Sequence, residues 1–279
     1  MSKQMVVSVV GCGWLGLPLA ESLIIKGYSV KGSTTSEDKL KVLENRGIDP
    51  YLVHFGDDSS PNAAGLLDCD VLIIAVPPGS RTPQGAANYR QMADYFTGII
   101  PHTRISKIIL ISSTAVYPEN NAPARESAEA APQTPAGKVL KEVEDRFLQM
   151  PDRSVIILRL AGLVGPDRHP GKFFKGKKDI PNGLAPVNLI HRDDVIGIIQ
   201  KIIAHDEATG IYNGCSPVHP SKMAFYRLAA AMAGEQLAEF VSEKGTSKII
   251  SGARVALELG YEFIHPDLEV WLKQTPADL

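Results

Sequence analysis

The chain has 279 residues, of which 44% are hydrophobic and 22% are charged, and its formal net charge is -2. This is the composition of an ordinary globular chain, so it excludes a fibrous protein and argues against a disordered one. The near-neutral charge gives no reason to expect nucleic acid or an acidic membrane surface as a partner. The length suffices for one large α/β domain, or for one full domain with a smaller dependent lobe.

The three cysteines, Cys12, Cys69 and Cys215, are far apart in the sequence and form no CxxC pair. They predict neither a disulfide framework nor a zinc site. The first residues hold an apolar run that glycine interrupts too early for a signal peptide, and no stretch approaches the roughly 18 apolar residues of a membrane span. We therefore expect a cytoplasmic protein with no membrane partner.

The first half of the chain alternates between strand and helix patterns. Strands are expected at 5–10, 28–34, 51–55, 70–76, 107–112 and 154–160, and helices at 14–26, 37–46, 84–99 and 137–149. Ser36 is expected to cap the second helix, and Gly47 to end it. Near-continuous apolar strands separated by helices predict a parallel sheet buried on both faces, which is the doubly wound Rossmann class of α/β fold.

After residue 161 the chain becomes rich in glycine and proline, and helices are expected again at 193–204, 221–233, 248–259 and 267–273. We interpret residues 1–161 as a dinucleotide-binding Rossmann domain and residues 162–279 as a smaller substrate-binding lobe, partly interleaved with the sheet. Open α/β sheets bind ligands outside the carboxyl ends of their strands, and the lobe is expected to cover that edge.

The segment Gly11-Cys12-Gly13-Trp14-Leu15-Gly16 has the spacing GxGxxG. It follows an apolar strand and opens a helix inside a βαβ unit of roughly 30 residues, which is the context that makes this pattern a dinucleotide-binding signal. Gly11 permits the tight turn, Gly13 lets the backbone approach the pyrophosphate, and Gly16 lets the helix pack close to the strand. We predict that this loop, with the backbone of Trp14 and Leu15, binds the cofactor.

The end of the second strand indicates which cofactor is bound. An NAD site expects Asp or Glu there to bind the ribose 2′-hydroxyl, but this chain has Ser33-Thr34-Thr35-Ser36. Ser33, Thr34 and Thr35 offer hydroxyl groups to a 2′-phosphate, and Lys39, or Lys31 across the strand end, adds positive charge. The sequence therefore favours NADP over NAD, with NAD as the alternative.

Several short motifs occur in an order that resembles the extended short-chain dehydrogenase/reductase superfamily, and within it the atypical members of the epimerase/dehydratase branch. They are GCGWLG, Gly56-Asp57, Ser112-Ser113-Thr114-Ala115-Val116-Tyr117, Arg159-Leu160-Ala161-Gly162-Leu163-Val164-Gly165-Pro166 and Ile190-His191-Arg192-Asp193-Asp194. The resemblance implies that Asp57 contacts the adenine and that Val76 and Pro77 pass close to the cofactor. It places Ser113 where the superfamily has its catalytic Ser or Thr.

Beside that residue the superfamily has a Tyr and a Lys in the pattern YxxxK, in which the Lys lowers the pKa of the phenol that exchanges a proton with the substrate. Aligning on Gly137, Lys138 and Glu144 places Ala136 at the Tyr position and Leu140 at the Lys position. A shift of two residues matches Lys138 with the Lys but puts Thr134 at the Tyr position. The tyrosine is missing in either register.

Three explanations of this departure remain open. In the first, the protein is an oxidoreductase or epimerase-like enzyme, with Ser113 as hydrogen-bond donor and Tyr117, Lys138 or a substrate group as proton carrier. In the second, it is a catalytically inactive protein that senses the ratio of NADP to NADPH. In the third, it belongs to another oxidoreductase class, similar to ketopantoate reductase or prephenate dehydrogenase, in which an all-helical domain follows the sheet.

Arg168 precedes a basic run in which lysines alternate with Phe173 and Phe174. In sugar-nucleotide relatives the corresponding segment faces the substrate, so the resemblance implies that Arg168 holds a phosphate of a small, phosphate- or nucleotide-bearing substrate. The alternative is a solvated loop. His191 lies beside an expected helix start, where a structural hydrogen bond is its expected role, and the spacing of the histidines predicts no metal site.

Overall fold

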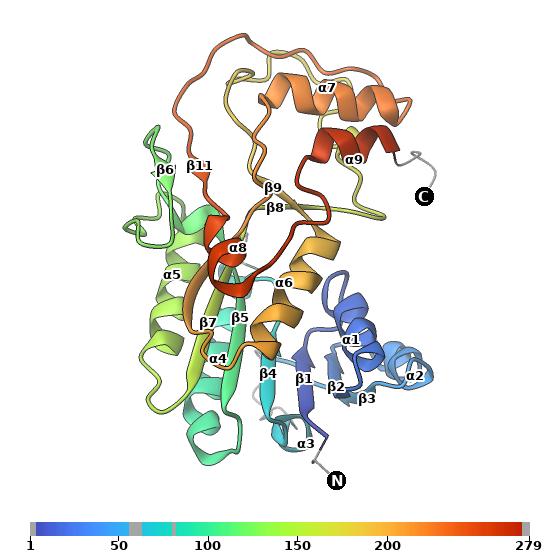
Figure 1. The fold of residues 1–279 in the computed structure, drawn as a ribbon, viewed down its shortest axis with the longest axis vertical. Helices are drawn as coiled ribbons and strands as arrows, with labels where there is room; N and C mark the ends of the chain where they lie inside the picture. The colour runs from blue at the N-terminus through green and yellow to red at the C-terminus, as the bar shows by residue number, and fades with distance from the viewer. Residues whose placement is uncertain (1–3, 56–62, 80–81, 275–279) are drawn as a thin grey trace. The chain divides into compact units, whose positions relative to one another are not determined.

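The apolar strands form one seven-stranded sheet in the computed structural model, which describes residues 4–55, 63–79 and 82–274 (Figure 1). The strand order is β10-β7-β5-β4-β1-β2-β3. The strands are β1 (Val6–Val10), β2 (Ser29–Thr34), β3 (Asp49–Leu52), β4 (Val71–Ile74), β5 (Lys107–Ser113), β7 (Ser154–Leu160) and β10 (Gly210–Gly214). The ladders joining β3, β2, β1, β4 and β5 are parallel.

The order of the strands reverses between β1 and β4, because the chain runs outward from β1 to β3 and then returns to build the other half from β4. The carboxyl ends of β1 and β4 therefore flank the topological switch point, where doubly wound sheets bind their ligands. The predicted fold class is confirmed: this is a Rossmann-like α/β fold with flanking helices. Strand β10 was not among the expected strands.

The described chain divides into two compact units, and each unit is assembled from three segments. The first unit comprises Met1–Val116, Pro132–Leu158 and Ile199–Ile211. The second comprises Tyr117–Ala131, Arg159–Ile198 and Tyr212–Leu279. The backbone therefore passes repeatedly from one unit to the other.

The helical elements of the first unit are α1 (Gly16–Ile25), α2 (Glu37–Asn45), α3 (Ala64–Leu67), α4 (Pro83–Ile99), α5 (Pro135–Leu148) and the short turns η1 (Ile100–His102) and η2 (Thr114–Val116). Helices α4 and α5 start alike: Thr82 and Thr134 accept hydrogen bonds from the third residue of each helix, and proline follows the threonine. Ser36 lies at the N-terminal cap position of α2 as predicted, but its side chain makes no capping hydrogen bond. Gly47 follows α2 with the positive φ of 76° that was expected of it.

The second unit contains two small sheets. Strand β8 (Gly162–Val164) pairs in parallel with β9 (Leu189–His191), and β6 (Pro123–Ala124) pairs with β11 (Ile249–Ile250). The helical elements are η3 (Pro170–Lys172), α7 (Lys222–Met232), α8 (Ala253–Leu259) and α9 (Leu268–Gln274), while α6 (Arg192–Ala204) crosses from the second unit into the first. Side chains of β8 and β9 pack with α7 and α9 in a core that includes Val164, Leu189, Phe225, Trp271 and Leu272.

The expected helix at 248–259 was wrong in its first turn. Ile249 and Ile250 pair with Pro123 and Ala124, and the helix begins only at Ala253. It ends where predicted, because Gly260 adopts the left-handed conformation with φ of 58°. Among the described residues, no helix combines the length and the apolar character that a membrane span requires.

Candidate functional site

The loop between β1 and α1 holds three glycines, which differ in how much space a Cβ atom would have at each position. Gly11 has a φ of 92°, and a Cβ there would lie 3.2 Å from the carbonyl oxygen of Ala75. A Cβ on Gly16 would lie 2.1 Å from the carbonyl oxygen of Gly11, so only glycine lets α1 start this close to the loop. A Cβ on Gly13 would meet nothing within 4 Å. The loop is thus closed at Gly11 and Gly16 and open at Gly13.

The start of α1 carries no side chain that would compete with an anion. Leu15, at the cap position, makes no side-chain hydrogen bond to the helix, and the first turn contains no acidic residue. Trp14 is half-buried and Leu15 is buried. The positive end of the helix dipole is therefore not offset by a carboxylate, which suits the binding of a phosphate.

The four residues expected to recognise the 2′-position divide into two pairs. Ser33 Oγ accepts a hydrogen bond from the Gly11 N–H at 3.0 Å, and Thr34 Oγ1 accepts one from the Ser36 N–H at 3.1 Å. Both side chains are buried. Thr35 and Lys39 are exposed. Ser33 and Thr34 therefore hold the local backbone, while Thr35 and Lys39 are available to a ligand.

The segment after β4 borders the same loop. Val76 Cγ2 would lie 3.3 Å from a Cβ on Gly11, so the end of β4 packs directly against the glycine turn. Pro77, the next residue, is exposed. Asp57 lies outside the described residues. The structure thus brings Gly11, Ser33 and Val76 together from the ends of three neighbouring strands.

Ser113 ends β5, and its Oγ accepts a hydrogen bond from the Ala115 N–H at 3.2 Å. Among the described residues, no acceptor receives the hydroxyl hydrogen of Ser113. Helix α5 begins close by, because a Cβ on Gly137 would lie 2.6 Å from the Ala115 carbonyl oxygen. Leu140 is buried and Lys138 is exposed. Two residues on a helix are about 200° apart, so Lys138 projects from a different face than Ala136 and Leu140.

Tyr117, which the sequence offered as a proton carrier, belongs to the second unit and is only 2% exposed. Its hydroxyl donates to Asn213 Oδ1 at 3.0 Å, and its ring faces the Arg159 guanidinium at 4.8 Å. Burial raises the pKa of Tyr117, so the phenol holds its proton more firmly than usual. These contacts give Tyr117 a structural role, and we assign it no proton transfer.

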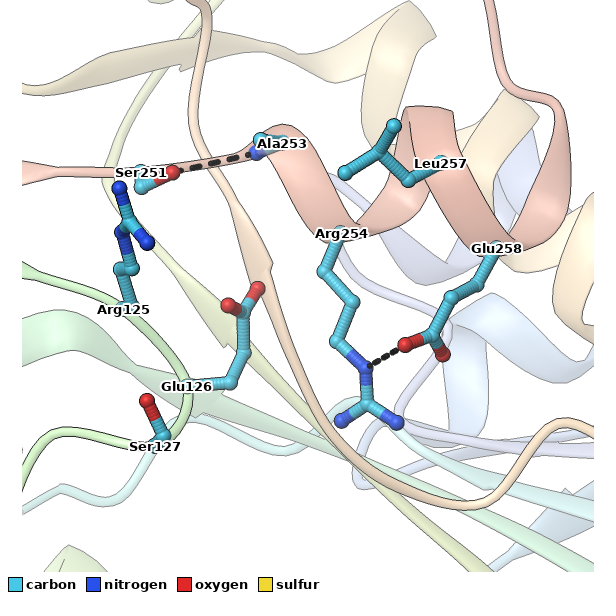
Figure 2. A pocket seen from close by; sticks show the side chains of 8 residues that line it. All are labelled: Arg125, Glu126, Ser127, Ser251, Ala253, Arg254, Leu257 and Glu258. Atoms are coloured by element: carbon cyan, nitrogen blue, oxygen red, sulfur yellow. Dashed lines mark hydrogen bonds and ion pairs between the residues drawn. The ribbon is translucent and has the colours of Figure 1, made fainter.

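A pocket of about 410 Å³ in the second unit is lined by the 125–127 segment, Ser251 and α8, and its lining includes the apolar side chains of Ala253 and Leu257 (Figure 2). Arg254 pairs with Glu258 at 2.9 Å on one side, and Arg125 and Glu126 lie on the other. Glu126 accepts the Asn213 N–H at 2.9 Å, and burial raises the pKa of its carboxyl group. No local pattern in the sequence indicated this pocket, because its two sides are distant in the chain.

Arg168 is exposed and is not among the residues that line this pocket. The basic run after it is attached to the rest of the second unit: the Phe174 ring contacts Tyr226 at 4.7 Å, and Lys175 pairs with Glu235 at 2.7 Å. Lys178 likewise pairs with Glu239 at 3.0 Å. The segment is therefore anchored by aromatic contacts and ion pairs rather than being a purely solvated loop.

Comparison with known proteins shows which folds and which domain this chain resembles. Residues 6–133 match the family model described as the NAD binding domain of 6-phosphogluconate dehydrogenase. The fold is similar to MoeE5 in complex with UDP-glucuronic acid and NAD, with a TM-score of 0.75, 18% identity and 96% of each chain covered. It is also similar to the human epimerase family protein SDR39U1 with NADPH, with a TM-score of 0.75, 16% identity, and 99% and 100% covered.

The chain thus has a Rossmann-like fold, which it shares with epimerase/dehydratase and other short-chain dehydrogenase/reductase proteins, and its residues 6–133 are similar to an NAD-binding domain. It is 40% identical over 266 residues to Protein YeeZ of Escherichia coli strain K12, which covers 94% of this chain and 96% of that protein. The chain belongs to the YeeZ family. The expected all-helical domain of the third explanation is absent from the described residues, since the second unit contains β6, β8, β9 and β11.

Proposed function

We propose that the protein is an NADP-binding oxidoreductase or epimerase-like enzyme of the atypical extended short-chain dehydrogenase/reductase type. The observation that carries this is the glycine loop, which is closed by backbone contacts at Gly11 and Gly16 and has free space at Gly13. That is the cradle a pyrophosphate needs beside an uncapped helix start.

The preference for NADP rests on the exposed side chains after β2. No carboxylate occupies residues 33–36, and exposed donors are Thr35 in this segment and Lys39 in α2. A hydroxyl and an ammonium group stabilise a 2′-phosphate dianion, whereas a ribose 2′-hydroxyl gains little from them. We assign recognition of the 2′-phosphate to Thr35 and Lys39.

A bound nicotinamide dinucleotide supplies or accepts a hydride. Ser113 is the candidate catalytic residue: one lone pair of its oxygen accepts the Ala115 N–H, and its hydroxyl hydrogen can be donated to a carbonyl or alcohol oxygen of the substrate. Gly137 fixes the start of α5 against the segment after Ser113. With Ala136 and Leu140 at the positions of the superfamily pair, proton transfer falls to Lys138 or to a group of the substrate itself.

The substrate class we propose is a small molecule that bears a phosphate or nucleotide. The structure of MoeE5 has a nucleotide-sugar acid bound together with its cofactor. In this chain the second unit supplies exposed guanidinium groups, with Arg168 after β8 and Arg125 at the pocket of Figure 2. Guanidinium groups bind phosphate oxygens through paired hydrogen bonds.

The second candidate is a catalytically inactive NADP sensor. The observation in its favour is that Tyr117, the phenol that the sequence offered in place of the missing tyrosine, donates to Asn213 from a buried position. Such a protein would have two conformations that bind NADP and NADPH with different affinities. The ratio of the two cofactors would then set the populations of these conformations.

Cofactor titrations test the binding proposal. We expect Thr35→Asp and Lys39→Ala each to weaken NADPH binding and to leave NADH binding unchanged or improved. Lys41→Ala is the matched control, because Lys41 is also on α2 but pairs with Glu44. Equal effects of Lys39→Ala and Lys41→Ala on NADPH affinity would contradict the assignment.

Turnover separates the two candidates. A panel of alcohols, ketones and nucleotide sugars is followed by NADPH absorbance, or by product analysis for an internal redox reaction. The enzyme proposal expects turnover that Ser113→Ala reduces while NADPH affinity stays the same. Tight NADPH binding with no turnover across the panel would favour the sensor.

A further inference from the structure

A cluster of metal-ligating side chains lies in the second unit, where β9 ends and α6 begins. His191 is the last residue of β9, Asp193 is in the first turn of α6, and His265 is in the loop between α8 and α9. One nitrogen of each imidazole and one oxygen of the carboxylate lie within 4.8 Å of one another. The sequence predicted no metal site, because His265 is far from His191 in the chain and the spacing of either residue is uninformative alone.

The distances between these side-chain atoms fit coordination of one metal ion. Asp193 Oδ2 is 3.5 Å from His191 Nδ1 and 3.7 Å from His265 Nε2. A Zn²⁺ ion held at about 2.0–2.2 Å by each atom in tetrahedral geometry separates its ligand atoms by roughly 3.4 Å. Two of the three separations therefore already have the required length, with the Asp193 carboxylate between the two rings.

A second carboxylate holds His265 in this place. Asp194 Oδ1 accepts hydrogen bonds from Tyr261 Oη at 2.8 Å and from the Ile264 N–H at 2.7 Å. Its Oδ2 accepts the His265 N–H at 3.1 Å. The loop that carries His265 is thus attached by its backbone to the start of the helix that carries Asp193. Such support is typical of sites whose ligands must be held before the ion arrives.

The two imidazoles are also fixed by packing. Their ring centroids are 4.0 Å apart, and the Trp271 ring lies 4.9 Å from His191. His191 Nδ1 accepts the Asp193 N–H at 3.2 Å, so an ion that takes the Nδ1 lone pair must displace this hydrogen bond.

Ion access does not require the unit to open. His191 is 2% exposed, but the side chains of His265 and Asp193 are 21% and 47% exposed. The cluster thus has a buried ligand at its base and two partly exposed ligands at its mouth. Three protein ligands leave a coordination position for water or for an exogenous group.

We propose that His191, Asp193 and His265 form a binding site for one divalent transition-metal ion of the zinc class. Two imidazoles and one carboxylate are a ligand set that suits Zn²⁺ and its neighbours in the first transition row, and not Mg²⁺ or Ca²⁺. The bound ion joins the start of α6 to the loop between α8 and α9.

Metal titration of the full chain, free of any histidine tag and pretreated with EDTA, tests the site. We expect one equivalent of Zn²⁺ to bind and to raise the thermal midpoint, with EDTA reversing the change. Co²⁺ in the same site should give visible absorption bands of a low-coordinate complex. Asp193→Asn and His265→Gln should each weaken Zn²⁺ binding by more than the roughly 10–100-fold that follows loss of an outer-sphere partner. His102→Gln, which replaces an exposed histidine of the first unit, should leave the affinity unchanged.

A measurement on the unaltered protein guards against variants that fail to fold. Zn²⁺ at saturation should protect His265 from a histidine-acylating reagent, as read by peptide mass spectrometry, while His102 stays reactive. The proposal is overturned by the absence of saturable binding at one equivalent, by equal Zn²⁺ affinity in all three variants, or by equal modification of His265 with and without Zn²⁺.

Discussion

Gly13 and Gly16 lie in the same loop, but the fold requires glycine at only one of these two positions. Gly16 is required by the fold, because a methyl group there would overlap the Gly11 carbonyl oxygen. Gly13 has open space around it, so the fold does not require glycine there. A requirement at Gly13 must come from something that approaches the backbone from outside.

We therefore expect Gly13→Ala to keep the stability of the protein and to lose dinucleotide affinity by about tenfold or more, equivalent to about 1.4 kcal/mol. Calorimetric titration with NADPH and chemical denaturation measure the two quantities. Gly98→Ala is the matched control: Gly98 in α4 also has nothing within 4 Å of a Cβ, so it should bind normally and gain about 0.5–1 kcal/mol of stability. Normal NADPH affinity in Gly13→Ala would remove the loop from the binding site.

The carboxyl group of Glu126 leads to a prediction for pH. Burial raises its pKa above the ordinary value of a glutamate, so the folded state holds the proton to a higher pH than the unfolded state does. Its contribution to stability is thus complete below the unfolded pKa and falls as pH rises through the folded pKa. A glutamine side chain in its place would still accept the Asn213 N–H without ionising. The stability of Glu126→Gln relative to the unaltered chain should therefore increase from acidic pH to neutrality.

Denaturant unfolding at a series of pH values checks this, with Glu129→Gln as the control at an exposed position. A relative stability that stays level with pH, or that changes equally in both variants, would contradict the burial of Glu126.

At the residue scale, local motifs were predictable and distant partners were not. The glycine loop could be recognised because its task depends on neighbours within the same short segment. The bond from Gly11 to Ser33 depends on how β1 and β2 pair, and the buried bond of Tyr117 depends on Asn213, 96 residues later. The sequence around Gly11 or Tyr117 therefore does not indicate that Ser33 or Asn213 is its hydrogen-bond partner.

At the scale of elements, Lys107 shows how a helix end is held. This lysine starts β5, is only 6% exposed, and donates from Nζ to the carbonyl oxygens of Ile202 at 2.9 Å and His205 at 2.7 Å. These carbonyls are at the C-terminal end of α6, where the helix dipole is negative. Burial lowers the pKa of Lys107, so the desolvation of the ammonium group is the main cost of this arrangement.

We expect Lys107→Met to lower the free energy of unfolding by roughly 1.5–3 kcal/mol, since it removes charge-assisted bonds and leaves buried carbonyls unsatisfied. Lys201→Met, at an exposed position in the last turn of α6, should change stability by less than about 0.5 kcal/mol. Urea unfolding followed by circular dichroism measures both. Equal effects would mean that the Lys107 contacts contribute nothing beyond general surface charge.

Element prediction succeeded where burial was uniform. The apolar runs that became β1, β4, β5 and β7 were evident, because strands buried on both faces have little polar interruption. It failed for β10 and for the short strands β6, β8, β9 and β11, which are two or three residues long and are defined by their pairing partners. A strand this short has no period of its own to detect.

At the scale of the whole molecule, neither unit is a continuous piece of the sequence. A fragment of residues 1–161, the domain expected from the sequence, lacks the segment Ile199–Ile211 that belongs to the first unit. It would lose β10 and the α6 carbonyls that Lys107 binds.

We expect this fragment not to unfold cooperatively and not to bind NADPH on its own. Co-expression with residues 162–279 should restore both properties, because it supplies the missing strand and helix end. Heteronuclear NMR and NADPH titration of the fragment test this. A well-dispersed spectrum and normal affinity for the isolated fragment would show that the interleaved segment is dispensable.

The hydrogen bond from the Gly11 N–H to Ser33 Oγ limits how the cofactor preference of this protein can evolve or be engineered. An acidic residue at position 33 would place a charge where the glycine loop needs a compact neutral acceptor. A substitution there that favoured NAD would therefore also disturb the loop that binds the pyrophosphate. The accessible route runs through positions 35 and 39, whose side chains are exposed. Selection for NAD in a laboratory lineage should therefore accumulate changes at these two positions and leave Ser33 in place.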